Sequence, residues 1–210
     1  GKVFSTQPIA EAQDMYGNLD KDFAETVTAS ISSGSGTLGG APLKTLVSGQ
    51  ASYAGNSLLY TALSDGETFT FMVDDELGGE DLTAATVTLS ADAVASRLAF
   101  VKEPSALVNP GANFAADSVQ VAAQDANGLL DTDYTAKIRL RAVSVEDTSV
   151  VVDSLQASPD DSLNANGGVA SWTNLKLPLA DLIKLRASSG ILQAGLSNPV
   201  AIPGALFVGI

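Results

Sequence analysis

The sequence of 210 residues contains neither cysteine nor histidine. Without cysteine the chain can form no disulfide and no thiolate metal site. Without histidine it lacks the commonest general base and the commonest metal ligand, and with them the usual Ser/His/Asp triad. It also lacks a run of about 18 apolar residues, so a transmembrane helix is not expected. These absences remove several classes of enzyme and metalloprotein and leave binding and structural roles open.

Positive charge is scarce as well. Eleven lysines and arginines stand against 24 acidic residues, which gives a net charge of −13 and an isoelectric point near 4.1. Proteins that bind nucleic acid present lysine and arginine to phosphates, so a nucleic-acid partner is not expected. The sequence has no Gly-x-Ser-x-Gly elbow, no phosphate-binding glycine loop before a helix, and nothing that singles out two carboxylates for glycoside hydrolysis. We therefore expect a protein that is not an enzyme.

One acidic turn is present twice. Residues 13–23 and residues 124–134 have the same pattern of Gln-Asp, a glycine-containing turn and a short Asp-x-Asp-aromatic segment, and the spacing between equivalent positions is constant throughout. An alternating apolar run follows each copy, at residues 27–31 and 138–142. A turn that recurs in the same context at about a hundred-residue spacing predicts tandem domains.

Short alternating runs predict β-strands along the whole chain, and no segment of ten or more residues has a helical period. The predicted strands are residues 2–8, 9–14, 26–32, 44–47, 50–53, 68–73, 84–91, 96–103, 118–125, 137–141, 150–152, 168–172, 183–187 and 196–202. Residues 33–40 are expected to be a Gly/Ser loop, and residues 58–63 fit no single class. About seven short strands per unit favour an all-β protein with two tandem immunoglobulin-like β-sandwich domains.

The repeats set the expected domain limits. We expect one sandwich over residues 1–94 and a second over 95–203, whose first connection is about 15 residues longer. The junction contains no Gly/Ser tract, which predicts little freedom between the domains. Residues 204–210 either begin a further repeat, because Ala-Leu-Phe-Val at 205–208 is similar to Leu-Ala-Phe-Val at 98–101, or form an ordinary final strand. The N-terminus does not have the form of a signal peptide, so an exported protein is expected to be present here as a mature form or an excised piece.

The motifs of the first unit resemble the bacterial immunoglobulin-like repeats, of the Big and invasin type, that occur in surface and secreted proteins. Five segments carry the resemblance: Asp-x-x-Gly-Asn at 14–18, Asp-x-Asp-aromatic at 20–23, the Thr/Val-rich strand at 27–31, Gly-Thr-Leu-Gly-Gly at 36–40, and Gly-x-Ala-x-aromatic at 49–53. The second unit departs from the pattern, with Asn-Gly-Leu at 127–129 and with residues 143–158 in place of the Gly-Thr-Leu loop.

The resemblance implies an extracellular location, at the bacterial cell surface or secreted, and it transfers no catalytic residue. It leads us to expect a non-enzymatic structural protein that serves as a spacer or building block of a surface array or fibre, such as a surface layer. Its partners would be neighbouring domains or copies of the same protein. The alternative is a carbohydrate- or receptor-binding module of an adhesin, with cell-surface polysaccharide as a partner. An accessory domain of a large secreted enzyme is a third hypothesis.

Two clusters of oxygen-bearing side chains are candidate calcium sites, because Ca²⁺ takes several oxygen ligands from flexible loops. The candidate ligands are Asp14, Asn18, Asp20 and Asp22 in the first turn and Asp125, Asn127, Asp131 and Asp133 in its copy. Asp and Asn are also the residues that build turns without any metal, so both interpretations stay open. A further acidic run, at residues 74–76 and 80–81, is either a cation site or a solvated loop.

A basic stripe is the second candidate site. Alternation places five of the 11 basic residues on the outer face of two strands that would be neighbours in one sheet: Lys137, Arg139, Arg141, Lys184 and Arg186. The stripe is either a docking surface for an acidic partner, such as an anionic polysaccharide or the acidic face of another subunit, or a solubilising face. Trp172 stands where the first unit has Tyr53; a core position is expected, and an exposed tryptophan that stacks on sugar is the alternative.

Overall fold

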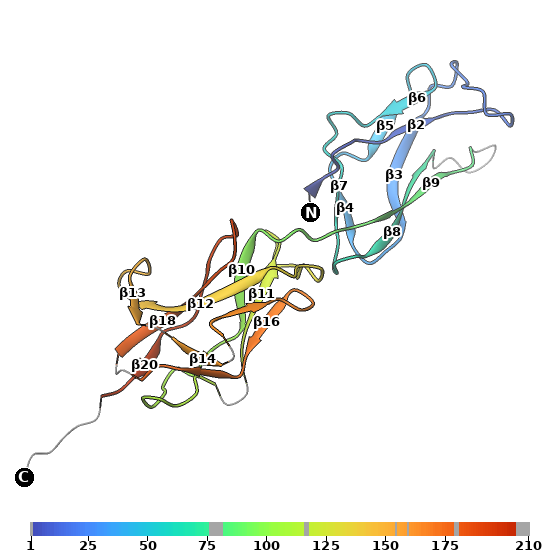
Figure 1. Cartoon of the computed structure of the whole chain (residues 1–210). Helices are drawn as coiled ribbons and strands as arrows, with labels where there is room; N and C mark the ends of the chain where they lie inside the picture. Colours follow the sequence, from blue (N-terminus) through green and yellow to red (C-terminus); the bar gives the residue numbers. More distant parts are fainter. Residues whose placement is uncertain are drawn as a thin grey trace, which may run out of the picture. The chain divides into compact units, whose positions relative to one another are not determined.

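The computed structural model describes residues 2–75, 82–115, 118–153, 155–158, 160–178 and 181–204. Every regular element in these ranges is a β-strand, and the chain separates into two compact units, Gly1–Asp92 and Ala93–Ile210 (Figure 1). The expected all-β, sandwich-type architecture is thereby confirmed. That each unit is an independent immunoglobulin-like domain stays a prediction. Since the described part of the chain contains no helix, it offers none that could cross a membrane.

The first unit has nine described strands, all of which pair antiparallel. They are β1 (Lys2–Val3), β2 (Ile9–Glu11), β3 (Thr26–Ser33), β4 (Thr37–Gly39), β5 (Leu43–Thr45), β6 (Gln50–Ser52), β7 (Leu59–Thr61), β8 (Thr68–Asp74) and β9 (Ala85–Ser90). They form a sheet of order β5-β3-β8-β9, a sheet of order β1-β7-β4 and the pair β2-β6 (Figure 1).

Alternation in the two long strands builds the core of this unit. Val27 and Ala29 of β3 are buried, as are Phe69 and Phe71 of β8, while their neighbours in sequence are more exposed. The opposite layer contributes a second buried set: Ala12, Ala51, Tyr53, Leu58 and Tyr60. Tyr60 stacks on Phe69 with ring centroids 3.8 Å apart. Two sheet faces therefore share one apolar layer, as in a sandwich.

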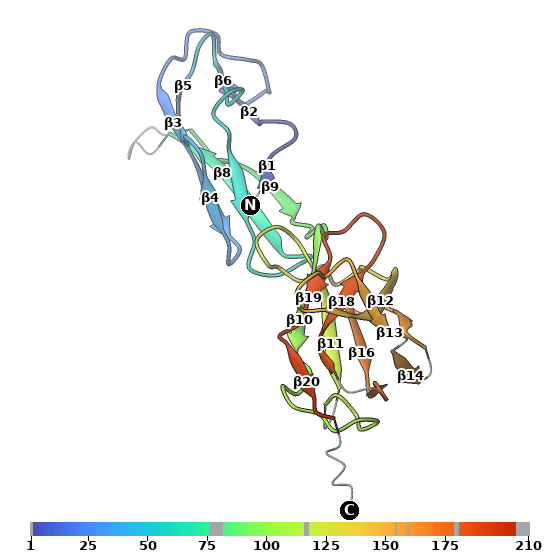
Figure 2. The same ribbon diagram turned by 90° about the vertical axis from the view of Figure 1, so that its left-hand side faces the viewer.

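The second unit has eleven described strands. They are β10 (Arg97–Lys102), β11 (Val119–Gln124), β12 (Lys137–Ser144), β13 (Val151–Asp153), β14 (Gln156–Ser158), β15 (Ser162–Asn164), β16 (Val169–Trp172), β17 (Asn174–Lys176), β18 (Asp181–Ser188), β19 (Gly195–Leu196) and β20 (Val200–Ile202). One sheet has the order β10-β11-β16 (Figure 2), and β14 pairs with β17. The other sheet has the order β13-β12-β18-β19, with β15 also paired to β12 and β20 to β18.

The core of the second unit lies between these sheets. Ile138 and Leu140 of β12 and Ile183 and Leu185 of β18 are fully buried, and they share a cluster with Trp172 of β16. Phe114, from the long first connection, is 1% exposed and belongs to the same cluster. The additional residues of this connection therefore supply core side chains as well as loop.

Most predicted strands are present, with differences at the short ones. The strand predicted over residues 2–8 is confined to Lys2–Val3, and residues 58–63 contain β7. The prediction of a loop over residues 33–40 is wrong for β4, and β14, β15 and β17 were not predicted. Strands of three residues show too few alternations to be recognised from sequence. Residues 76–81 and 205–210, which carry part of the acidic run and the similarity to residues 98–101, lie outside the described residues.

The two units differ in the place of their first strand. In the second unit β10 pairs with β11, from Arg97↔Gln124 to Lys102↔Gln120. In the first unit β1 pairs with β7 instead. Gln7 holds this segment there, because its side chain accepts a hydrogen bond from the Leu58 N–H (2.9 Å) and donates one to the Leu58 carbonyl (3.0 Å).

Candidate functional site

The basic stripe begins on β12, where exposure alternates residue by residue. Ile138 and Leu140 face the core, and Lys137, Arg139 and Arg141 are exposed. The strand is hydrogen-bonded on both sides, by β18 and by β13 and β15, so its outer side chains are fixed in direction. The backbone thus presents three basic side chains to solvent at two-residue spacing.

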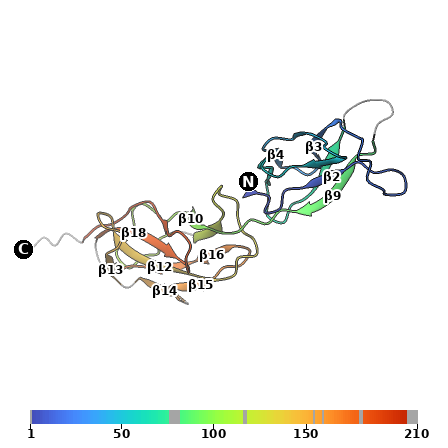
Figure 3. The ribbon, with the colours of Figure 1, turned by 90° about the horizontal axis from the view of Figure 1, so that it is seen from above.

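The stripe continues on β18, which lies beside β12 (Figure 3). Arg186 is exposed and Lys184 is half-buried. The register places Arg141 opposite Arg186 and Val143 opposite Lys184. The prediction that the two strands are sheet neighbours is therefore confirmed, and all five basic residues belong to one sheet face.

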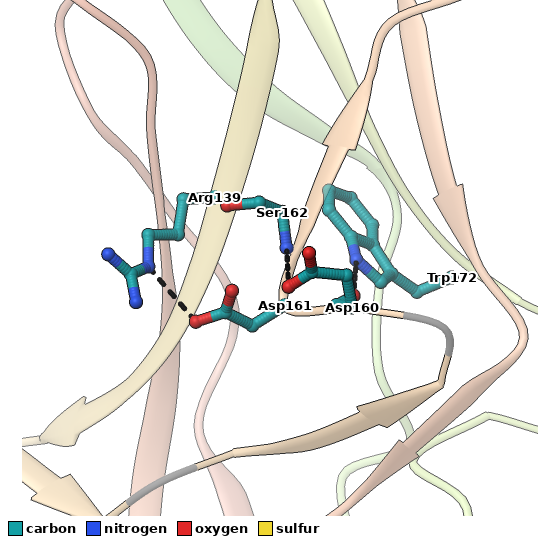
Figure 4. Close-up of polar contacts among 5 residues, drawn as sticks. All are labelled: Arg139, Asp160, Asp161, Ser162 and Trp172. Carbon is teal, nitrogen blue, oxygen red and sulfur yellow. Dashed lines mark hydrogen bonds and ion pairs between the residues drawn. The ribbon is translucent and has the colours of Figure 1, made fainter.

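Carboxylates neutralise one end of this face. The Arg139 Nε lies 3.0 Å from Oδ2 of Asp161 in an ion pair between partly exposed side chains (Figure 4). The pKa of the neighbouring Asp160 is lowered, first by hydrogen bonding with the Asp161 side chain, then by the Ser162 N–H, with a smaller effect of the positive charge of Lys137. The backbone carbonyl of Asp160 accepts a hydrogen bond from the indole of the buried Trp172 at 3.2 Å, which ties the loop to the core (Figure 4).

At the other end of the face, the described residues supply no such carboxylates. Within the described ranges, Arg141, Lys184 and Arg186 take part in no ion pair. Arg141 and Arg186 are direct cross-strand partners, and like charges in that position destabilise a sheet by a few tenths of a kcal/mol to about 1 kcal/mol. The sheet therefore carries an unfavourable charge pair that a bound anion would relieve.

The first acidic turn is held together by its own aspartate. Oδ1 of Asp14 accepts hydrogen bonds from the N–H groups of Tyr16 and Asn18, both at 2.9 Å, and Oδ2 accepts one from the Asn18 amide at 3.0 Å. The pKa of Asp14 is lowered, first by the side-chain amide of Asn18 and then by its N–H. Gly17, at the tip, has a φ of 83°.

The second turn has the same two backbone bonds, and its side-chain amide bond comes from two residues after the aspartate instead of four. Oδ1 of Asp125 accepts from the N–H groups of Asn127 and Leu129, both at 2.8 Å, and Oδ2 accepts from the Asn127 amide at 3.1 Å. Burial acts to raise the pKa of Asp125, but the hydrogen bonds from Leu129 and Asn127 outweigh it and the pKa is lowered. In both units the leading carboxylate is engaged by its own turn, as Asx turns require.

The hydrogen bonds of Asp14 and Asp125 with their own turns do not include the other candidate aspartates, which are Asp20 and Asp22 in the first turn and Asp131 and Asp133 in the second. Oδ1 of Asp20 accepts from the Asp22 N–H at 3.0 Å. Asp131 is buried, and its Oδ2 accepts from the Ala95 N–H at 2.7 Å; Asp133 is exposed. Among the described residues no three acidic side chains form a group that could hold a metal ion. Calcium binding therefore stays a prediction, and turn hydrogen bonding accounts for most of these residues.

Three other candidates are placed as follows. Tyr53 and Trp172 are 0% and 1% exposed, so the expected core positions are confirmed and stacking of Trp172 on sugar is wrong. In the acidic run, Asp75 is buried and accepts from the Leu82 N–H at 3.0 Å. Glu76, Glu80 and Asp81 of this run lie outside the described residues.

Glu67 is a polar anchor that sequence reasoning did not identify. Its carboxylate accepts hydrogen bonds from the N–H and hydroxyl of Ser35, the Gly36 N–H, the Tyr60 hydroxyl and the Leu63 N–H. These bonds, led by Leu63 and then Tyr60, lower its pKa to about 2. Glu67 thereby fixes the loop before β4. Because most of its donors are distant in the sequence, no local sequence pattern indicates this role.

Comparison with known proteins gives no family. No protein-family model matches the chain, and no curated protein matches it. Among solved structures, a β-glycosidase from Bacteroides vulgatus is similar over 85% of this chain and 21% of that one, with 11% identity and a TM-score of 0.39. β-Glucuronidase 3 from Bacteroides uniformis is similar over 86% and 21%, with 14% identity and a TM-score of 0.34. The chain thus spans about a fifth of the length of these structures.

Proposed function

We propose that the chain is a non-enzymatic structural protein, a building block of an extracellular bacterial array or fibre. The observation that carries the proposal is the basic face of the second unit, where Arg141 and Arg186 oppose each other without an ion pair among the described residues, in a protein that is otherwise acidic. A rigid sheet that presents fixed positive charge is suited to hold an acidic surface in a defined orientation.

The acidic partner that best fits is another copy of the chain. The first unit, residues 1–92, has three lysines and no arginine against 13 acidic residues, for a net charge of −10. The second unit, residues 93–210, has eight basic residues against 11 acidic ones, for a net charge of −3. Both units are net negative, so any attraction is local: the basic face of the second unit in one copy would meet the strongly acidic first unit of another copy. An anionic polysaccharide would meet the same face.

The adhesin alternative has less support. Its sugar-stacking candidate, Trp172, lies in the core, and no described exposed aromatic cluster takes its place. The hypothesis of an accessory domain of a secreted enzyme rests on no residue of this chain, and the weak likeness to glycosidases carries no argument.

The test compares two charge variants with the same change of net charge. In the first variant, Arg139, Arg141 and Arg186 are replaced by Ser. In the control, Lys21, Lys44 and Lys176, which lie outside the basic face, are replaced by Ser. Sedimentation equilibrium at low salt should show association that the first variant loses and the control keeps. Equal association of both variants would remove the basic face from the proposal.

A further inference from the structure

Strand β2 of the first unit has one edge that no described strand covers. It pairs with β6 through Ile9↔Ser52, Ala10↔Ala51 and Glu11↔Gln50, and with no other strand of the described residues. Ile9 is 62% exposed. An unpaired strand edge presents N–H and C=O groups that readily accept another strand, so proteins usually cover such an edge.

The second unit covers the same edge. Its strand β11 corresponds to β2 at the same sequence spacing that separates the two acidic turns, and β10 lies along it (Figure 2). Leu98 of β10 is 4% exposed within the core. Its N–H also donates to the Gln193 carbonyl at 2.9 Å, so β10 closes the gap toward β19. The second unit thus shows how this edge is covered, whereas no described strand of the first unit covers it.

In the first unit the corresponding place is a groove. It is lined on one side by Ala10 of β2 and by Ala12, which follows that strand, and on the other by Val73, Asp75 and residues 82–85. Its volume is only about 30 Å³, so it accepts a small inward-facing side chain while the backbone of an added strand lies along its mouth.

A buried carboxylate in the lining of this groove is only half satisfied. Asp75 is 7% exposed and its Oδ2 accepts from the Leu82 N–H, but its Oδ1 has no hydrogen-bond partner in the described structure. A buried carboxylate oxygen without a donor costs roughly 1–3 kcal/mol. A strand laid in the groove brings backbone N–H groups, which are the donors that such an oxygen lacks.

We propose that residues 204–210 of a second copy add to β2 as the missing strand. Their Ala-Leu-Phe-Val at 205–208 is similar to Leu-Ala-Phe-Val at 98–101, which belongs to the strand that occupies the equivalent place in the second unit. The segment is uncharged in its side chains, so these meet the acidic rim of Glu11 and Asp74 without repulsion. The binding mode is β-strand addition, in which backbone bonds supply affinity.

The second unit also fixes the register of the proposed joint. In the second unit, Leu98, Ala99 and Phe100 pair with Ala123, Ala122 and Val121. If Phe207 takes the place of Phe100, and each β11 residue is replaced by its equivalent in the first unit, the expected pairs are Ala205↔Ala12, Leu206↔Glu11 and Phe207↔Ala10. The small Ala205 then takes the place of the buried Leu98, which matches the small volume of the groove. The joint deepens the proposed function and rests on it, because it links copies head to tail.

The register can be tested with cysteines, since the chain has none of its own. Directly opposed residues of antiparallel strands lie within disulfide reach. The test variant is Glu11→Cys with Leu206→Cys, and the control is Lys44→Cys, on a different sheet, with Leu206→Cys. Ala99→Cys with Ala122→Cys, a pair observed within the second unit, serves as the positive control and should form an internal disulfide.

Mild oxidation of the test variant should give a ladder of disulfide-linked multimers at least ten times as abundant as in the control. Removal of residues 205–210 from the unmodified chain should weaken association by a similar factor in sedimentation equilibrium. An equal ladder in test and control, or undiminished association after the removal, overturns the joint. If association then still depends on the basic face, the building-block proposal survives; if the unmodified chain does not associate, both fail.

Discussion

Replacement of Gly168 by Ala tests how the acidic turn of the second unit, residues 124–134, is fixed to the sheet β10-β11-β16. Gly168 has a φ of 76°, and a Cβ added there would lie 2.1 Å from the carbonyl oxygen of Asp131. Gly49 of the first unit has the same φ, and its Cβ would lie 2.1 Å from the carbonyl oxygen of Asp20. The close approach of these two backbones is therefore a shared feature of both units. Gly167 offers a matched control, because its φ is also positive, at 57°, while nothing lies within 4 Å of its Cβ position.

The magnitudes follow from these contacts. A left-handed backbone costs an alanine about 1–2 kcal/mol, so Gly167→Ala should lower the free energy of unfolding by about that amount. Gly168→Ala adds a clash with backbone that cannot rotate away, and forced overpacking costs a further 1–3 kcal/mol or so. The clash would also strain the hydrogen bond from the Ala123 N–H to the Gly168 carbonyl, now 2.9 Å. The middle of the overpacking range, about 2 kcal/mol, is the difference that we expect between the two variants.

The assay is urea unfolding followed by tryptophan fluorescence. Trp172 is the only tryptophan and lies in the core of the second unit, so the signal reports on that unit. With a denaturant slope of about 1–3 kcal/mol per molar urea, the two midpoints should differ by roughly 1 M. Equal midpoints for Gly167→Ala and Gly168→Ala would refute the argument that the backbone contact with Asp131 fixes the turn.

Three further predictions concern the turns and the loop anchor. Asp125→Ala should destabilise the second unit by about 1 kcal/mol, because two N–H groups lose their acceptor. Asp125→Asn keeps an acceptor oxygen and should retain part of the lost stability. Urea unfolding measures both variants. Because the pKa of Glu67 is lowered to about 2, its carboxylate stabilises the fold above about pH 4.5, and this stabilisation is lost as the pH falls toward 2. In calorimetry, the melting temperature of Glu67→Gln should therefore depend less on pH in that range than the melting temperature of the unmodified chain. An unchanged slope would contradict this. Millimolar Ca²⁺ should raise the melting temperature only if the acidic turns bind it, and the rise should then disappear in the Asp14→Asn, Asp125→Asn double variant.

The sequence predicts the elements that repeat their pattern several times. β3, β8, β12 and β18 each span seven or eight residues, so their alternation of buried and exposed side chains is visible without a structure. The pairing of β12 with β18 followed from this alternation together with the expected sandwich topology. The basic face could thus be predicted residue by residue.

The remaining features depend on contacts between distant segments. The position of β1 on β7 is set by Gln7 and Leu58, which are far apart in the sequence, and no local pattern encodes that contact. The same holds for Glu67, because three of the five hydrogen bonds donated to it come from Ser35 and Gly36, in the loop before β4 and more than 30 residues away. The two acidic turns were visible in the sequence, but only the hydrogen bonds of Asp14 and Asp125 show that the turn itself engages these carboxylates.

The measurement that tests the central claim most directly is sedimentation velocity of the unmodified chain, residues 1–210, over a hundredfold range of concentration, with and without millimolar Ca²⁺. The building-block account predicts reversible association that grows with concentration and weakens as salt screens the attraction between the acidic unit and the basic face. A single monomeric species at every concentration, indifferent to salt and calcium, would contradict the account.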